Sequence, residues 1–546
     1  MESIPWWRDA IVYQIYVRSF ADADGDGVGD LEGIRGRLPY LAELGVDAVW
    51  LTPFYRSPMV DGGYDVADYR DVDPLFGDLA AFDRLVADAH AHGLRMIVDM
   101  VPNHSSSAHP WFQQALAAPA GAAERERYIF VDDPGGADGA PPNNWRSVFG
   151  GPAWTRVPDG QWYLHLFAPE QPDLNWRNPE IHREFLDILR FWLDRGVDGF
   201  RIDVAMGLYK AEGLPSVPTD LQGMQSSSPM WGRPEVHEVY REWRKLLDAY
   251  DGERMAVGEV WTDSAEDLAL YVRPDELHQC FNFAWLEAPW EAAAFRTVID
   301  DTLAALGTAP TWVLSNHDVV RHVTRYGEGS LDPDAGVARA RAAVLTMLAL
   351  PGSAYLYQGE ELGLPEVKDL PPESRQDPTF FRTGGEIPGR DGCRVPLPWS
   401  GSEPPFGFSA DFPAGPARPS RSEGSSNGPA GDAKGRVTAP APPWLPQPAD
   451  WAALTVERQL ADPTSMLSFY RRMLSLRRDR VRSLPSAITW LDSPEESLFF
   501  SRGTLICALN CGDDPVPLPA HGEVLISTVP VSDVLPPNAA AWLTAP

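Results

Sequence analysis

The sequence predicts an α/β fold, a TIM (β/α)8 barrel with an inserted small domain after strand 3 and a C-terminal all-β sandwich domain. Eight short apolar runs alternate with amphipathic stretches, a long gap follows the third run, and the end of the chain is strand-like throughout. Strand–helix alternation of this kind is typical of a parallel sheet covered by helices. The eight strand-like runs are residues 11–16, 48–52, 94–101, 199–204, 255–260, 280–283, 312–315 and 354–357.

The stretches between the runs have the spacing of helices. In one of them Asn178 and Pro179 supply an N-cap and a first-turn proline. The apolar residues after them recur at helical spacing. They are Ile181, Phe185, Ile188, Leu189 and Trp192.

Two long gaps interrupt the alternation. The first separates the third and fourth runs and contains clusters of Trp, Gly and Pro, which indicates an inserted domain at residues 103–172. The second, residues 359–450, is a long loop region after the eighth strand. The barrel is therefore expected to comprise residues 1–102 and 173–478.

Residues 413–443 of this loop region are rich in Pro, Gly, Ser and Ala, and Val437 is their one large apolar residue. A segment of this composition cannot bury enough apolar surface to offset the entropy that is lost on ordering. We expect a mobile loop here.

The C-terminal part, residues 479–546, has short apolar runs separated by turn residues and none of the helical spacing seen earlier. This pattern predicts a small β-sandwich. The expected strands are residues 487–491, 498–501, 505–509 and 523–528.

The charge balance excludes some partners. The chain has 46 Lys and Arg against 77 Asp and Glu, a net charge of −31. Such a surface repels nucleic acid phosphates and anionic lipids, so we expect neither nucleic acid nor membrane as a partner. The surplus of acid otherwise serves solubility and identifies no partner. The sequence leaves the oligomeric state open.

The cysteines and the N-terminus indicate a cytoplasmic protein. Cys507 and Cys511, in one predicted strand, lie roughly 13 Å apart, too far for a disulfide. The first residues lack a basic region followed by an apolar run, and no apolar stretch of about 18 residues occurs.

Four acids lie at the ends of predicted barrel strands: Asp99, Asp203, Glu259 and Asp318. In a TIM barrel these strand ends converge on one pocket. The alternative is that each acid only pairs with an arginine such as Arg201 to stabilise the barrel. A whole set of buried acids is rare enough to favour catalysis.

Glycoside hydrolysis is a reaction that needs such a set. One carboxylate attacks the anomeric carbon, and a second, protonated carboxyl donates its proton to the leaving oxygen. Two acids close together raise the pKa of one of them, which suits a general acid.

Several motifs together resemble glycoside hydrolase family 13, the α-amylase clan, and in particular its α-glucosidases of the maltase and oligo-1,6-glucosidase type. The resemblance covers nearly the whole chain, except residues 413–443. The matching motifs are DMVPNH at 99–104, QPDLN at 171–175, GFRIDVA at 199–205, GEV at 258–260, SNHD at 315–318 and YQGEE at 357–361.

The resemblance implies roles for individual residues. Asp203 corresponds to the nucleophile, Glu259 to the general acid/base and Asp318 to the stabiliser of the transition state. Arg201 corresponds to the arginine that keeps the nucleophile ionised. The implied substrate-binding residues are Arg201, His104 and His317, the pair Asp61 and Tyr64 at the non-reducing end, and Arg394, which in such enzymes pairs with the residue at position 61.

An acidic loop at residues 22–30, with the sequence DADGDGVGD, resembles a calcium site. Its acids alternate, and glycines allow it to bend around a cation that prefers oxygen ligands. A solvated acidic turn is the alternative. The resemblance favours one structural Ca2+, with Mg2+ less suited. The expected ligands are Asp22, Asp24, Asp26, Asp30 and the carbonyl of Val28.

The sequence therefore predicts a retaining, exo-acting α-glucosidase for maltose and short oligosaccharides. A glucosyl transferase or isomerase could use the same covalent intermediate, and a non-catalytic relative would lack the nucleophile or the acid. Val204, after the nucleophile, accompanies α-1,6 activity in this group. Residues 274–278 and 380–385 instead resemble maltases, and we favour α-1,4 substrates.

Overall fold

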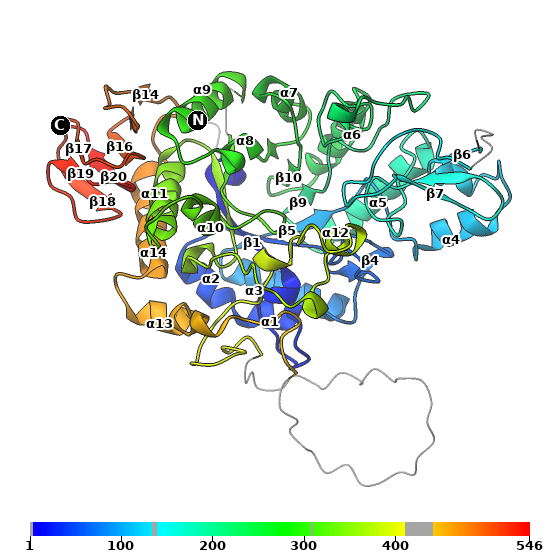
Figure 1. The fold of residues 1–546 in the computed structure, drawn as a ribbon, viewed down its shortest axis with the longest axis horizontal. Coiled ribbons are helices and arrows are strands. Elements are labelled where there is room, and N and C mark those ends of the chain that lie inside the picture. Colours follow the sequence, from blue (N-terminus) through cyan, green and yellow to red (C-terminus); the bar gives the residue numbers. More distant parts are fainter. Residues whose placement is uncertain (1–3, 134–138, 307–309, 410–440) are drawn as a thin grey trace, which may run out of the picture.

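The barrel predicted from the sequence is present. The computed structural model describes residues 4–133, 139–306, 310–409 and 441–546. Its centre is an eight-stranded parallel sheet in the order β11-β10-β9-β5-β2-β1-β13-β12. A bridge between Phe281 and Thr311 joins the two ends of this sheet and closes it into a barrel, which lies at the middle of the molecule (Figure 1).

The eight barrel strands coincide with the eight predicted runs. They are β1 (Ile11–Ile15), β2 (Ala48–Leu51), β5 (Arg95–Met100), β9 (Gly199–Ile202), β10 (Met255–Gly258), β11 (Gln279–Cys280), β12 (Thr311–Val313) and β13 (Ser353–Tyr357). The sixth prediction, residues 280–283, extends too far. Phe283 already belongs to helix α8 (Phe283–Glu287), because the side chain of Asn282 caps that helix by accepting from the N–H of Trp285.

Helices surround the barrel, and the one predicted from its capping signals is confirmed. Helix α5 (Pro179–Leu193) has Pro179 in its first turn, and Asn178 caps it by accepting from the N–H of Glu180. The other helices of this part are α1 (Leu31–Gly36), α2 (Leu38–Leu44), α3 (Leu79–Ala91), α6 (Val236–Leu247), α7 (Ala265–Ala269), α9 (Ala292–Leu306), α10 (His322–Gly327), α11 (Ala335–Ala349), α12 (Pro378–Arg382), α13 (Val456–Ala461) and α14 (Met466–Leu476).

The predicted insertion after the third barrel strand forms a lobe on one side of the barrel (Figure 1). It contains helix α4 (Pro110–Ala117) and a sheet of β6 (Phe130–Val131), β8 (Trp162–Leu164) and β7 (Trp154–Arg156). A separate small hairpin, β3 (Tyr55–Arg56) and β4 (Asp68–Val72), follows the second barrel strand.

The C-terminal part is all-β, as predicted, and lies on the opposite side of the barrel (Figure 1). Its larger sheet has the order β14-β15-β16-β20-β18, and a smaller one pairs β17 with β19. Trp542 ties this part to the barrel, because its indole donates to the carbonyl of Leu345 in α11 at 2.9 Å. The strands are β14 (Thr489–Trp490), β15 (Ser497–Arg502), β16 (Leu505–Asn510), β17 (Val516–Pro517), β18 (Val524–Ser527), β19 (Val534–Leu535) and β20 (Ala539–Thr544).

The predicted mobile loop at residues 413–443 lies outside the described residues up to residue 440. The chain resumes beside the acidic loop, where the N–H groups of Ala441 and Trp444 donate to the carbonyls of Gly25 and Gly27. Among the described residues, no helix is long and apolar enough to cross a membrane.

Candidate active site

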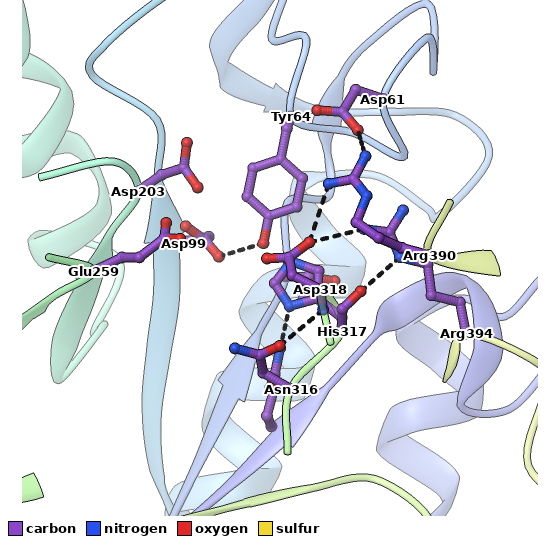
Figure 2. Close-up of polar contacts among 12 residues, drawn as sticks. Asp61, Tyr64, Asp99, Asp203, Glu259, Asn316, His317, Asp318, Arg390 and Arg394 are labelled. Carbon is purple, nitrogen blue, oxygen red and sulfur yellow. Dashed lines mark hydrogen bonds and ion pairs between the residues drawn. The ribbon is translucent and has the colours of Figure 1, made fainter. Parts of the chain in front are cut away.

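The four predicted acids come together at the carboxyl ends of the barrel strands. Asp99 is in the last part of β5, Asp203 directly follows β9, and Glu259 directly follows β10. Asp318 follows β12 after a short turn, in which the side chain of Asn316 accepts from the N–H of Asp318 at 2.8 Å. Figure 2 shows Asp99, Asp203 and Glu259 on one side of Tyr64, with Asp318 on the other.

Three of these acids share one guanidinium, and we call Asp99, Asp203 and Glu259 the acid group. Nη1 of Arg201 donates to Asp99 at 2.9 Å and to Asp203 at 2.6 Å. Nη2 of the same arginine donates to Oε2 of Glu259 at 2.6 Å. All four side chains are buried. Burying three acids around one arginine is costly in desolvation, so a role in stability alone is a poor explanation and the arrangement favours a catalytic role.

Two members of the acid group, Asp99 and Asp203, hold protons more tightly than free carboxyl groups do. Burial raises the pKa of Asp99 to about 6, although Arg201 opposes the rise. Burial also raises the pKa of Asp203 well above its usual value, and Glu259 and Asp99 add to the effect. One guanidinium therefore does not offset the burial of these two carboxyl groups, which stand beside other acids.

The residue after Asp203 has an unusual backbone. Val204 is a β-branched residue with φ of 45°, in the left-handed region that such residues rarely adopt. Its N–H donates to Oε2 of Glu259 at 3.0 Å. The strained turn therefore connects the predicted nucleophile to the predicted general acid/base, and strained backbone is common at functional sites.

A second group lies across the pocket, and we call Asp61, Asp318 and Asp377 with Arg390 and Arg394 the arginine group. Asp318 accepts from Arg390 at 3.0 Å and from Arg394 at 2.9 Å. Asp377 accepts from Nε of Arg390 and lies 3.9 Å from Arg394. Figure 2 shows both arginines converging on Asp318.

The predicted pairing of Arg394 with Asp61 is corrected. Asp61 accepts from Arg390 at 2.6 Å, whereas Arg394 donates to Asp318 and to the carbonyl of His317. Both arginines lie in the motif that suggested the pairing. Its spacing could not show which one reaches Asp61, because they flank the short 3-10 helix Asp391–Cys393, which turns the chain between them.

The three acids of the arginine group differ in the direction of their pKa shifts. Burial would raise the pKa of Asp318, but its neighbours His317, Arg390 and Arg394 lower it far below the usual value. Asp377 is also buried, and the two arginines lower its pKa to about 2. Burial raises the pKa of Asp61, which directly contacts only Arg390 among these arginines.

The remaining predicted binding residues line the space between the groups. Tyr64 donates to Asp99 at 3.0 Å and stacks on His317 with ring centres 5.2 Å apart. Burial lowers the pKa of His104 to about 4, which leaves a neutral ring for hydrogen bonds to hydroxyls. Burial also lowers the pKa of His317 well below its usual value.

Sequence reasoning missed some contributors to this site. Gln171 donates to Asp61 at 3.0 Å and lies 3.1 Å from Nε2 of His104. Lys210 is buried behind this histidine, where it donates to Asn103 at 2.9 Å and pairs with Asp173 at 2.8 Å. Gln171 is part of a motif that the sequence analysis noted, but Lys210 follows no motif and only the fold places it.

The acidic loop has a donor set that suits a hard cation. Carboxylate oxygens of Asp22, Asp24 and Asp30 lie within 4.8 Å of one another. Asp22 is buried and accepts from the N–H groups of Gly25 at 2.7 Å and Gly27 at 2.9 Å. Oxygen donors in a loop bent by glycines fit Ca2+. Asp26 does not belong to this cluster.

A TIM barrel with paired carboxylates at the carboxyl ends of its strands is typical of glycoside hydrolases, which use two such acids. Residues 14–414 match the family described as alpha amylase, catalytic domain, and the chain belongs to this family of glycoside hydrolases.

Relatives with known names agree with this assignment. A probable alpha-glucosidase of Rhizobium meliloti is 37% identical over 95% of this chain and 93% of its own length. An oligo-1,6-glucosidase of Parageobacillus thermoglucosidasius is 35% identical over 87% of this chain and 84% of its own length. The crystal structure of the alpha-glucosyl transfer enzyme XgtA is 37% identical and matches with a TM-score of 0.86 over 100% of both chains.

Proposed function

We propose that the chain is a retaining, exo-acting α-glucosidase that releases glucose from maltose and short oligosaccharides. The observation that carries the proposal is the shared contact of Asp203 and Glu259 with Arg201. It holds a nucleophile and a proton donor side by side at the end of neighbouring strands. Relatives named as α-glucosidases support this substrate class.

The first step forms a covalent intermediate. An oxygen of the Asp203 carboxylate attacks the anomeric carbon while Glu259 donates its proton to the glycosidic oxygen, and the aglycone leaves as an alcohol. Arg201 donates to Asp203 and favours its ionised form. Asp318, held ionised by the arginine group, faces the positive charge that develops on the sugar.

The second step releases the sugar. Glu259, now a carboxylate, takes a proton from water, and the water oxygen attacks the anomeric carbon and displaces Asp203. Two inversions give net retention. Glu259 ends the cycle protonated and Asp203 ends it ionised, so both return to their starting states.

Removal of terminal residues fits the closed end of the pocket. Asp61 is fixed from two directions, by Arg390 at 2.6 Å and by Gln171 at 3.0 Å. Arg382 further joins the loop after β13 to the inserted domain through the carbonyl of Gly150. A chain that continued beyond the non-reducing sugar would meet this wall.

A structural Ca2+ in the acidic loop is part of the proposal. Asp22, Asp24 and Asp30 would bind it, and we keep Asp26 and the carbonyl of Val28 as further candidate ligands. When bound, the ion supplies stability and no chemistry. Mg2+ would require tighter octahedral geometry than a glycine-rich loop favours.

Two points of the proposal have alternatives. One is the linkage of the bond that is cleaved, and the other is the molecule that accepts the glucosyl group. Val204 is buried beside Glu259 and is the feature that favours α-1,6 substrates. The similarity to an alpha-glucosyl transfer enzyme supports a second candidate, in which a sugar replaces water in the second step. We propose small α-glucosides as the partners, with neither nucleic acid nor membrane.

We also propose a cytoplasmic location. All four cysteines, Cys280, Cys393, Cys507 and Cys511, are free thiols. Free thiols fit a reducing compartment.

The test of the proposed double displacement is which anomer of glucose appears first. NMR at the initial rate of 4-nitrophenyl α-glucoside hydrolysis, which releases a single glucose, should show α-glucose before mutarotation, and β-glucose appearing first would exclude the double displacement. Isomaltose and sucrose, assayed beside maltose with product analysis, separate the linkage and transfer alternatives.

A further inference from the structure

The two oxygens of Glu259 have unequal surroundings. Oε2 accepts from Nη2 of Arg201 at 2.6 Å and from the N–H of Val204 at 3.0 Å. Oε1 accepts from the indole Nε1 of Trp261 at 3.2 Å. Because a cation and a backbone amide already occupy Oε2, the transferable proton belongs on Oε1.

Trp261 is itself held firmly. Its ring stacks on Phe283 with centres 4.1 Å apart and planes 19° apart, and its backbone N–H contacts Sδ of Met206 at 3.4 Å. The ring packs against an apolar cluster inside the barrel that includes Trp50 and Phe281. The packing of the whole cluster, of which the stack is one part, fixes the plane of the indole and thus the direction in which its N–H points.

We propose that Trp261 is a positioning residue for the general acid, whose indole N–H keeps Oε1 of Glu259 directed to the leaving oxygen. This inference rests on the proposed function. When Glu259 gives its proton to the glycosidic oxygen, Oε1 becomes part of a carboxylate, and the hydrogen bond from the indole becomes charge-assisted. The bond is therefore stronger after proton transfer than before, which lowers the barrier.

The alternative is that Trp261 only fills space. Trp261→Phe separates the two, because phenylalanine keeps an aromatic ring against Phe283 and removes the N–H. Phe283→Leu is the matched control, since it removes the stack and keeps the N–H. Trp261→Met, which is apolar and also lacks the N–H, repeats the test if the phenylalanine variant does not fold.

The measurement is how the loss of kcat/KM depends on the leaving group of the substrate. We expect Trp261→Phe to lower kcat/KM for maltose by about tenfold or more, because proton donation to a poor leaving group limits that reaction. For 4-nitrophenyl α-glucoside, which needs little protonation, we expect a change below about threefold. Phe283→Leu should change both substrates by a similar factor.

The pH profile gives a second readout. The charged groups that face Glu259 are Arg201, Asp203 and Asp99, and Trp261→Phe leaves all of them in place. Loss of a donor to the carboxylate favours the protonated acid, so the alkaline limb of kcat/KM for maltose should move to higher pH. The limb of Phe283→Leu should stay where it is.

The outcomes are distinct. Equal losses on both substrates with an unchanged alkaline limb would show that Trp261 only packs, and would overturn the inference while leaving the proposed function intact. A wild-type enzyme that hydrolyses neither maltose nor the aryl glucoside with retention would instead remove the proposed function. Circular dichroism and the melting temperature of each variant establish that it is folded.

Discussion

The two halves of the active site contain equal numbers of acids and unequal numbers of arginines. In the acid group Asp99, Asp203 and Glu259 share Arg201, whereas Asp318 and Asp377 of the arginine group each lie close to two guanidinium groups. Burial raises the pKa of Asp99 to about 6, and the two arginines lower that of Asp377 to about 2. Both side chains are buried, so the number of neighbouring cations decides whether the pKa is raised or lowered.

Asp61 supports this interpretation from within the arginine group. It contacts Arg390 and not Arg394, and burial leaves its pKa raised. Both arginines lower the pKa of Asp61, but only Arg390 touches its carboxylate, and burial is not offset there. Burial is offset at Asp318 and Asp377, which both arginines contact directly. In the proposed mechanism the acid group exchanges protons, and it has one arginine for three acids. The arginine group binds the sugar and stabilises charge, and it has two arginines for three acids.

The largest expected effect tests the nucleophile in the acid group. Asp203→Asn should lower kcat on maltose by far more than a hundredfold, since an amide cannot form the covalent intermediate. Asp99→Asn is the matched control, because Asp99 touches the same nitrogen of Arg201 and does not attack the sugar. A retained activity above about one hundredth in Asp203→Asn would exclude the assignment.

The next effect tests the arginine group. Arg390→Lys should lower kcat/KM for maltose by about ten- to a hundredfold, because a lysine cannot bridge Asp61, Asp318 and Asp377 as the planar guanidinium does. Arg375→Lys is the control, since Arg375 is buried on the same loop and donates to carbonyl oxygens only. Equal losses of kcat/KM in the two variants would show that the bridging of three acids by Arg390 does not matter for activity.

Much of this could be predicted from the sequence, because strand ends and motifs are local features. All eight barrel strands follow from apolar runs, and the position of the acids follows from the carboxylates at or just after the ends of four of them. The strand β20, which lies inside the C-terminal sheet, was missed because its sequence, AAAWLT, contains alanines, which have a low strand propensity. Only its neighbours β16 and β18 impose the strand.

The partners within the site could not be predicted, because they depend on side chains that are distant in sequence. Arg390 reaches Asp61 across 329 positions, and Gln171 reaches it across 110. The resemblance had assigned the pairing to Arg394, four residues after Arg390. Motifs identify which residues gather at a site, while the fold determines which of them touch.

The pH dependence of stability should have opposite signs in the two groups. Asp99 has a pKa of about 6 in the folded chain against 3.8 as reference, so it destabilises the fold progressively as pH rises from about 4 to about 6. Asp377, at about 2, stabilises the fold above about pH 4 and loses this effect as pH falls toward 2.

Urea unfolding of two variants measures these signs. Relative to wild type, the stability deficit of Asp99→Asn should shrink as pH rises from 4 to about 6. The deficit of Asp377→Asn should be full above about pH 4 and shrink below it. Deficits that change in the same direction would contradict the contrast between one cation and two.

The smallest effect concerns the acidic loop, which lies outside both groups and should affect stability alone. An ion that binds only the folded chain raises its apparent stability by mass action. A chelator should therefore lower the melting temperature by about one to two degrees, the shift that about 1–2 kcal/mol produces in a chain of this size, and added Ca2+ should restore it. At a temperature well below melting, kcat on maltose should stay unchanged, because no loop carboxylate belongs to either group.

Two variants locate the ion. Asp24 is exposed and belongs to the cluster with Asp22 and Asp30, while Asp26 is equally exposed and lies outside it. Asp24→Asn should abolish the response to chelator, and Asp26→Asn should weaken it less. Replacing Asp22 would be less informative, because its carboxylate also accepts from the N–H groups of Gly25 and Gly27.

If the chelator moved the melting temperature of neither wild type nor variants, the loop would be a solvated acidic turn. If it lowered kcat at constant fold, the ion would act on the active site, and the separation of stability from chemistry would be wrong.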